Sequence, residues 1–284
     1  MIPRAHITAW RGHVPWITDA QVEQDLVISR ALLDLFSDPL VAREVAFRGG
    51  TALHKLYFDP AARYSEDIDL VQVTPGPFGP VMAALRNKLD PWLGQPQWKQ
   101  SEGRVTFVYR FESEAKPVTP LKLKIETNTR EHLCVLGRQK RAFRVDNPWC
   151  RGETEIATYA VEELLGTKLR ALYQRKKGRD LFDLAEALMR LPRLSHGDIV
   201  TCFTRYLDGS NQRVTRDEFK NNLEAKLRDK TFLSDVPPLL AHGHVFDAPT
   251  AARLVTTNLL SKIAESKTKQ KRSRAIPPAT PRMR

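Results

Sequence analysis

Residues 47–70 read FRGGTALHKLYFDPAARYSEDIDL, a stretch that begins with a glycine pair and ends with two carboxylates on either side of one isoleucine. The apolar run before the glycines indicates a strand, and TALHKLYF after them indicates a short helix. DIDLVQV alternates apolar residues and indicates a second strand. The stretch therefore predicts a strand, a turn at Gly49-Gly50, a helix, and a strand that begins with Asp67 and Asp69.

The two aspartates and the glycine pair suit one kind of ligand. Strand side chains alternate between faces, so Asp67 and Asp69 share a face and repel each other. Mg²⁺ relieves this repulsion because it binds one or two carboxylates together with substrate phosphates. Glycines permit close backbone approach to a ligand, and the helix that follows offers free N–H groups to a phosphate. Together these features predict a site for a nucleoside triphosphate (NTP) and its metal, although each alone is common in turns and at strand ends.

The same stretch carries a family resemblance. Residues 49–70 resemble the signature of the AbiEii/AbiGii toxin nucleotidyltransferases, which include the MenT-type toxins and belong to the polymerase-β-like nucleotidyltransferase superfamily. In that superfamily a G-[GS] turn precedes a D-x-D metal pair, and this family's motif closes with RxSEDIDL, as residues 63–70 do here. The resemblance implies that Asp67 and Asp69 are catalytic and hold Mg²⁺. It implies nucleotide binding by four residues: Arg48, Gly49, Gly50 and Thr51.

A second motif lies a hundred residues further on. The family carries a lysine on a helix and then an aspartate in an RDLxDL-like motif, and TKLRALYQRKKGRDLFDL at 167–184 resembles it. Lys168 falls on the apolar stripe of its helix. Its ammonium group must therefore extend beyond the apolar side chains to solvent, or pair with an anion. That anion is either a triphosphate or a salt-bridge partner such as Asp180 or Asp183. The resemblance implies that Lys168 binds phosphate and that Asp180 orients the nucleophile or acts as a base, with Asp183 structural.

A third carboxylate is expected on a neighbouring strand. RVTFVYRFES and PLKLKIETNT indicate two antiparallel strands, and in the second of them Lys122, Lys124 and Glu126 share one face. Superfamily members commonly place an acid here, which makes Glu126 a candidate metal ligand. The alternative is a merely exposed sheet face. The basic run RKKGR at 175–179 is either a solvated face or, beside an active site, a group that guides RNA or holds phosphates.

The order of these elements predicts an α+β protein. The resemblance implies an N-terminal polymerase-β-like nucleotidyltransferase domain with a mixed sheet at 1–150. A mostly helical pattern follows, and we expect a helical domain at 151–265 that contributes Lys168 and Asp180 to the site. The sequence SKTKQKRSRAIPPATPRMR is basic and rich in proline, so the tail at 266–284 is predicted to be disordered. Near the N-terminus, residues 19–39 have helical spacing, with Asp19 as a candidate cap.

Composition narrows the partners. The formal net charge is +12, which favours polyanionic partners. No stretch is apolar enough to span a membrane and the N-terminus lacks a signal core, so a cytoplasmic protein without a membrane partner is predicted. The three cysteines show no CxxC spacing, which argues against a zinc site.

The resemblance also implies a function. It implies a toxin with a separate antitoxin encoded nearby, and an enzyme that moves a nucleoside monophosphate from an NTP to the 3′ end of tRNA, which blocks translation. Two alternatives stay open. One is a nucleotidyltransferase that modifies a protein or a small molecule, and the other is an NTP- or RNA-binding protein without catalytic activity.

Overall fold

The computed structural model describes residues 2–265 and confirms the α+β class. Its mixed seven-stranded sheet has the order β3-β4-β5-β2-β1-β7-β6. The strands are β1 (Val45–Arg48), β2 (Asp67–Gln72), β3 (Gln97–Ser101), β4 (Arg104–Glu112), β5 (Pro120–Asn128), β6 (Arg138–Asn147) and β7 (Cys150–Tyr159). The expected disordered tail at 266–284 lies outside the described residues.

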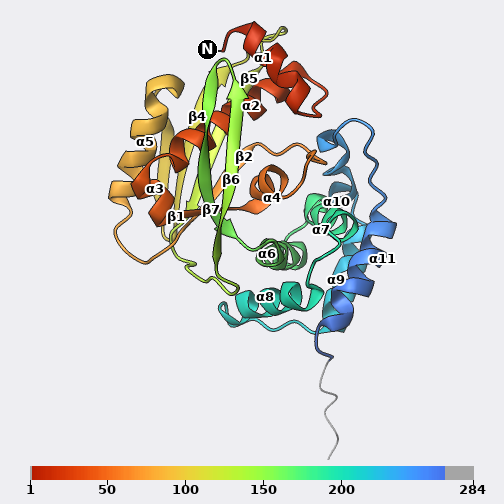
Figure 1. Cartoon of the computed structure of the whole chain (residues 1–284). Coiled ribbons are helices and arrows are strands. Elements are labelled where there is room, and N and C mark those ends of the chain that lie inside the picture. Colours follow the sequence, from red (N-terminus) through yellow and green to blue (C-terminus); the bar gives the residue numbers. More distant parts are fainter. Residues whose placement is uncertain (1, 266–284) are drawn as a thin grey trace, which may run out of the picture.

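Most helices of the first half of the chain pack beside the sheet, and the helices of the second half form a separate bundle (Figure 1). In the first half they are α1 (Arg4–Trp10), α2 (Asp19–Phe36), α3 (Pro39–Glu44), α4 (Gly49–Leu56) and α5 (Gly79–Leu93). In the second half they are α6 (Val161–Gln174), α7 (Gly178–Arg190), α8 (His196–Asp208), α9 (Arg216–Leu227), α10 (Lys230–Ser234) and α11 (Ala248–Asn258). Short 3₁₀ turns lie at Arg11–His13, Pro237–Leu239 and Leu260–Lys262.

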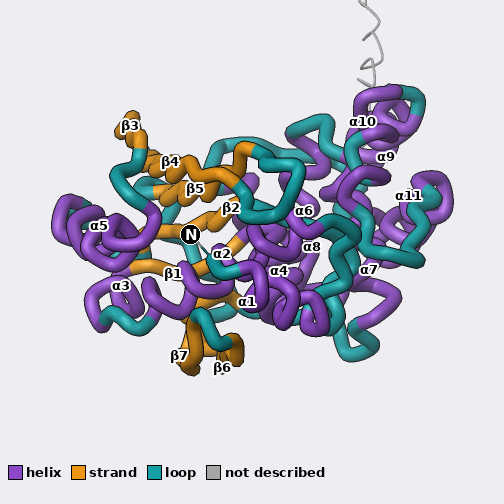
Figure 2. The backbone as a smooth tube through the Cα atoms, turned by 90° about the horizontal axis from the view of Figure 1, so that it is seen from above, coloured by secondary structure: helices purple, strands orange, loops and turns teal. Residues whose placement is uncertain are grey.

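Figure 2 shows the strands gathered in one half of the molecule and α6 to α11 in the other. The last strand, β7, belongs to the sheet and ends at Tyr159, and the first helix of the bundle begins at Val161. The division of the chain into domains at 150 and 151 stays a prediction. None of the helices in residues 2–265 is both long enough and apolar enough to cross a bilayer.

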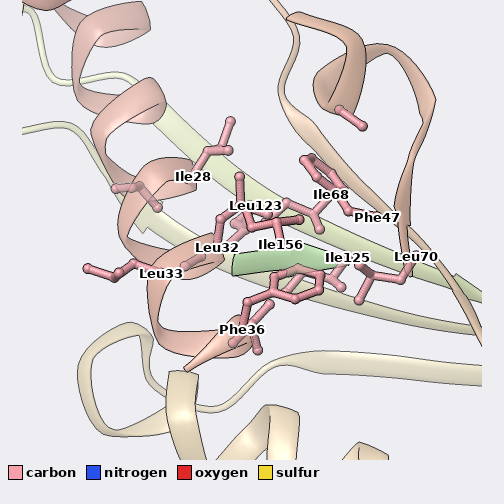
Figure 3. Packing of buried hydrophobic residues seen from close by; sticks show 14 of the residues in the cluster. Ile28, Leu32, Leu33, Phe36, Phe47, Ile68, Leu70, Leu123, Ile125 and Ile156 are labelled. Atoms are coloured by element: carbon pink, nitrogen blue, oxygen red, sulfur yellow. The ribbon is translucent and has the colours of Figure 1, made fainter. Parts of the chain in front are cut away.

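The sheet core explains why Asp67 and Asp69 face a cavity. One face of α2 packs on the sheet, as Figure 3 shows for Ile28 and Leu32 against strand residues such as Ile68, Leu70 and Ile125. Ile68 and Leu70 are fully buried in this core. Because side chains alternate along a strand, burial of Ile68 and Leu70 turns both aspartates to the opposite face. The apolar pattern of β2 therefore fixes where the carboxylates point.

Helix α2 begins with a different cap from the one expected. Thr18, not Asp19, is the N-cap residue, and its side chain accepts a hydrogen bond from the backbone N–H of Gln21. The Gln21 side chain in turn accepts one from the Thr18 N–H, which completes a capping box. Asp19 is the first residue inside the helix, where the positive end of the helix dipole stabilises its negative charge.

Helix α4 is held between the two halves of the molecule. Its Ala52 and Leu56 pack in the sheet core, whereas Leu53 packs in the core of the helical bundle. Near its C-terminal end, the Lys55 ammonium lies 2.7 and 2.8 Å from the two oxygens of the buried Asp25 of α2. These contacts on both sides fix the position of the Gly49-Gly50 end of the helix.

Candidate active site

The predicted glycine turn and the first aspartate pair meet at the junction of β1, β2 and α4. Strands β1 and β2 are antiparallel, with Arg48 paired to Asp69. Gly49 has a φ of +83°, and a Cβ on it would lie 2.2 Å from Asp69 Oδ2. Only glycine allows both this backbone conformation and this approach. The turn therefore brings the start of α4 directly against the second carboxylate of the pair.

Strand β5 brings the third carboxylate alongside. It runs parallel to β2, with Asp67 paired to Lys124 and Asp69 paired to Glu126. Neighbouring strands lie about 4.8 Å apart, so Glu126 and Asp69 are adjacent on one face of the sheet. The ammonium of Lys124 lies 3.1 Å from Glu126 Oε2 and 3.8 Å from Asp67 Oδ2. The expected position of Glu126 beside the aspartate pair is what the structure shows.

These carboxylates line one cavity of about 300 Å³ together with several cations. Its lining includes the acids Glu66, Asp67, Asp69 and Glu126 and the cations Arg63, Lys124, Lys168, Arg175 and Arg179. Gly50 at the start of α4 lies between the two groups of charges. The cavity therefore combines the carboxylates that a hard cation prefers with the cations that bind phosphate.

Two cations of the cavity lining that come from the helical half, Lys168 and Arg175, are paired with buried aspartates. On α6, the Lys168 ammonium lies 3.1 Å from Asp180 Oδ1 and 2.8 Å from Asp183 Oδ2. Arg175 donates to both oxygens of Asp180, at 2.7 and 2.8 Å. Burial alone would raise the pKa of Asp180, but Lys168 and Arg175 lower it below its usual value. Lys168 therefore meets both salt-bridge partners named from the sequence, and it also lines the cavity.

A buried arginine completes this network and was not assigned a role from the sequence. Arg63 donates to both oxygens of Asp183, at 2.6 and 2.7 Å. A Cβ on Gly50 would lie 2.5 Å from Arg63 Nη2, so the glycine allows the guanidinium to pack against α4. The signal was present, since Arg63 is the arginine of the RxSEDIDL motif, but its partner lies 120 residues away in the chain.

Asp183 is the most highly connected acid of the site. It accepts from Arg63, and His54 Nε2 lies 3.0 Å from its Oδ1. Burial would raise the pKa of Asp183, but the charges of Arg63 and Lys168 hold it well below its usual value. Burial and the nearby Arg63 lower the pKa of His54 from 6.5 to about 4, so the ring is neutral near pH 7. The contacts of Asp183 are those of a buried anion paired with several groups, and its structural role stays a prediction.

Four expected site residues are not among those that line the cavity: Arg48, Gly49, Thr51 and Asp180. Arg48 donates to Glu131 Oε2 at 2.9 Å, and Arg170 holds the same carboxylate from the other side. The buried Thr51 hydroxyl lies 2.8 Å from Ser65 Oγ and also donates to the backbone oxygen of Asp67. Asp180 is fully buried behind Lys168 and Arg175. Their roles in binding or catalysis stay predictions, and their contacts place them behind the residues that line the cavity.

The acids fit a divalent cation. Burial raises the pKa of Asp69, and the negative charges of Asp67 and Glu126 raise it further. A divalent cation would relieve this crowding of like charges. Within residues 2–265, no group of three or more His, Cys, Asp or Glu side chains is gathered closely enough to hold a metal alone. The assignment of Asp67, Asp69 and Glu126 as metal ligands therefore stays a prediction.

Comparisons with known proteins identify the family. The family model described as a nucleotidyl transferase AbiEii toxin of type IV toxin–antitoxin systems matches residues 30–251, most of the chain. The chain belongs to the AbiEii family. It is therefore a member of a nucleotidyltransferase toxin family, as the resemblance in its glycine turn and aspartate pair implied. Membership implies an NTP substrate and an antitoxin partner.

Solved structures share the fold of this AbiEii chain. MenT4, a nucleotidyltransferase toxin from Mycobacterium tuberculosis H37Rv, is 17% identical with a TM-score of 0.64, over 93% of this chain and 91% of that one. JHP933 from Helicobacter pylori is 16% identical with a TM-score of 0.57, over 85% of this chain and 91% of that one. At such identities the likeness shows the fold alone. A comparison with curated proteins found no match.

The first prediction concerns the glycine turn. Gly49→Ala should lower nucleotidyl transfer by about 100-fold or more, because the added methyl group displaces the Asp69 carboxylate and strains a positive φ. Gly79→Ala is the matched control, since Gly79 also begins a helix and a Cβ there meets nothing within 4 Å. The measurement is kcat/KM of both purified variants. Equal rates for Gly49→Ala and Gly79→Ala would contradict the assignment of the turn.

The second prediction concerns pH. His54 has a folded pKa of about 4, below its ordinary 6.5, so the unfolded chain binds the extra proton between these values and stability falls as pH decreases through that window. From pH 7 to pH 4, wild-type protein should lose about 3 kcal/mol of unfolding free energy more than His54→Asn loses. Urea unfolding at each pH measures the difference. An identical pH slope in the two proteins would refute the buried neutral histidine.

Proposed function

We propose that this AbiEii chain is a Mg²⁺-dependent enzyme that transfers a nucleoside monophosphate from an NTP to the 3′ end of tRNA. The observation that carries the proposal is the arrangement of charges in one cavity. Asp67 and Asp69 line this cavity together with Lys168 and Arg175. An NTP with its metal carries both kinds of charge that such a cavity binds.

Different residues would bind the metal and the phosphates of the nucleotide. Asp67 and Asp69 would hold Mg²⁺, with Glu126 beside them, and the ion when bound would neutralise phosphate charge. The free N–H groups at the start of α4, at Gly49 and Gly50, would face the triphosphate. In the reaction, the acceptor hydroxyl oxygen bonds to the α-phosphorus, the bond to pyrophosphate breaks, and the hydroxyl proton passes to water.

Lys168 and Arg175 would compensate phosphate charge from fixed positions. The Asp180 carboxylate accepts hydrogen bonds from both of them and is itself fully buried. Asp180 would therefore act through these two cations as a positioning residue, rather than as a base in contact with the acceptor. Arg48 would act in a similar way, since Glu131 fixes it beside Asp69, where its positive charge lowers the pKa of that aspartate against the effect of burial.

An RNA acceptor suits the surface beyond the cavity. The chain carries a formal charge of +12, and phosphate contacts dominate the binding of nucleic acids. A second hollow of about 620 Å³ is lined by two arginines, Arg104 and Arg130, and by two acids, Glu102 and Glu131. Arg104 also contacts Glu126 of the first cavity at 3.3 Å, so the two hollows adjoin. An acceptor that occupied the second hollow would lie beside the carboxylates of the first. We expect the protein to act in the cytoplasm, where its substrates and antitoxin are made.

The third prediction tests the donor and the acceptor together. Purified protein incubated with total tRNA, Mg²⁺ and each α-³²P-labelled NTP in turn should label tRNA with one or two of the four nucleotides. Asp67→Ala should reduce the label at least about 100-fold, because it removes a metal-binding carboxylate from the cavity. Glu112→Ala is the control, since Glu112 is an exposed acid at the far end of β4 and should leave labelling unchanged.

The same experiment separates the alternatives. Label on protein or on a small molecule in cell extract, with none on tRNA, would contradict the tRNA acceptor and favour another nucleotidyltransferase. Absence of transfer to every acceptor, with retained NTP binding, would favour a binding protein without catalysis. Equal labelling by wild type and Asp67→Ala would contradict the assignment of the metal-binding pair.

A further inference from the structure

One ammonium group lies among the carboxylates proposed to bind the metal. Lys124 Nζ is 3.1 Å from Glu126 Oε2 and 3.8 Å from Asp67 Oδ2. The contact follows from strand register, because Lys124 of β5 lies directly opposite Asp67 of β2. A cation of the protein itself therefore already compensates two of the three acids.

The three acids differ in how they are compensated. Glu126 has a cation at each oxygen, since Arg104 Nε lies 3.3 Å from Oε1. Asp67 is paired with Lys124 alone in the part of the chain that the structure describes. Asp69 forms no ion pair within residues 2–265. Of these contacts, the one between Lys124 and Asp67 is the longest, at 3.8 Å.

The two lysines that line the cavity also differ in how freely their side chains can move. The Lys168 side chain is 7% exposed and lies between two buried aspartates, so it is fixed. The Lys124 side chain is 32% exposed and ends in a compact charge on a flexible four-carbon stem. Lys124 can therefore leave its partners at low cost, whereas departure of Lys168 would remove one cation from each of two buried aspartates, Asp180 and Asp183.

We propose that Lys124 competes with the divalent cation for Asp67 and Glu126 and thereby sets the metal affinity of the site. The inference rests on the proposed function, because it takes these acids as the metal ligands. An ammonium and a divalent ion repel each other strongly at the few ångströms that separate groups sharing one carboxylate. Metal binding therefore displaces Lys124, and metal alone binds more weakly than the carboxylates would allow.

The displaced ammonium has a new partner close at hand. Lys124 lines the same cavity as Gly50 and Lys168, where the triphosphate is proposed to lie. A phosphate that receives Lys124 favours metal binding, and metal binding by the same coupling favours the nucleotide. Lys124 thus makes occupation of the site by metal depend on the presence of the substrate.

The test is a titration of the full-length protein with Mn²⁺ alone, with free Mn²⁺ followed by electron paramagnetic resonance. Lys124→Met should bind Mn²⁺ about tenfold more tightly than wild type, because it removes a competing charge without removing a ligand. Lys122→Met is the matched control. Lys122 precedes Lys124 by two residues on the same strand face, is exposed, and forms no ion pair within residues 2–265. It should change the affinity less than twofold.

The outcomes test the role of Lys124 separately from the assignment of the metal ligands. Tighter Mn²⁺ binding by Lys124→Met, with Lys122→Met unchanged, supports competition. If Lys124→Met binds Mn²⁺ as wild type does, or more weakly, while Asp67→Asn abolishes binding, the role of Lys124 is overturned and the metal site stands. If Asp67→Asn binds Mn²⁺ as wild type does, the metal assignment in the proposed function fails. Circular dichroism and thermal unfolding of each variant confirm that the proteins compared are folded.

Discussion

The carboxylate of Asp183 holds the candidate active site together. It is fully buried on α7 and pairs with Arg63 of the segment before β2 and with Lys168 of α6. It also contacts His54 of α4, so one anion joins the sheet half of the molecule to the helical half. A buried ion pair need not stabilise a protein relative to apolar packing, but removal of one partner costs about 3–5 kcal/mol. The network therefore specifies one arrangement of the two halves.

The cavity owes its charges to this junction. Strands β2 and β5 supply the acids, because burial of Ile68 and Leu70 on α2 turns Asp67 and Asp69 the other way. The helical half contributes Lys168 of α6, Arg175 just after it and Arg179 of α7, and the buried Asp180 pairs with Lys168 and Arg175. A site built in this way is preorganised on the phosphate side, where fixed charges lower the cost of binding. Beside the acids proposed to bind the metal lies a more exposed cation, Lys124.

Short-range sequence signals predicted one part of this site, and long-range contacts determine the rest. The glycine turn and the aspartate pair lie within 24 residues, so strand periodicity and the conformational needs of glycine sufficed to place them. The β6–β7 hairpin was missed, since the exposed part of β6 reads RQKRA and lacks the alternation of a half-buried strand. The motif alone does not indicate a role for Arg63, because the sequence does not show that its guanidinium pairs with Asp183. The sequence indicates Asp180 as a possible salt-bridge partner of Lys168, but it does not show that Arg175 also donates to both oxygens of Asp180.

Binding of a non-hydrolysable nucleotide tests the central claim most directly, because it requires neither the acceptor nor turnover. Equilibrium dialysis would measure the affinity of wild type and Asp67→Asn for the α,β-methylene analogues of ATP, CTP, GTP and UTP, each with Mg²⁺ and with EDTA. A metal-nucleotide site on Asp67 and Asp69 predicts that at least one analogue binds wild type in Mg²⁺, and that either EDTA or Asp67→Asn weakens it about tenfold or more. Binding of equal strength in Mg²⁺ and EDTA, unchanged in Asp67→Asn, would contradict the claim that these carboxylates hold the metal of the nucleotide.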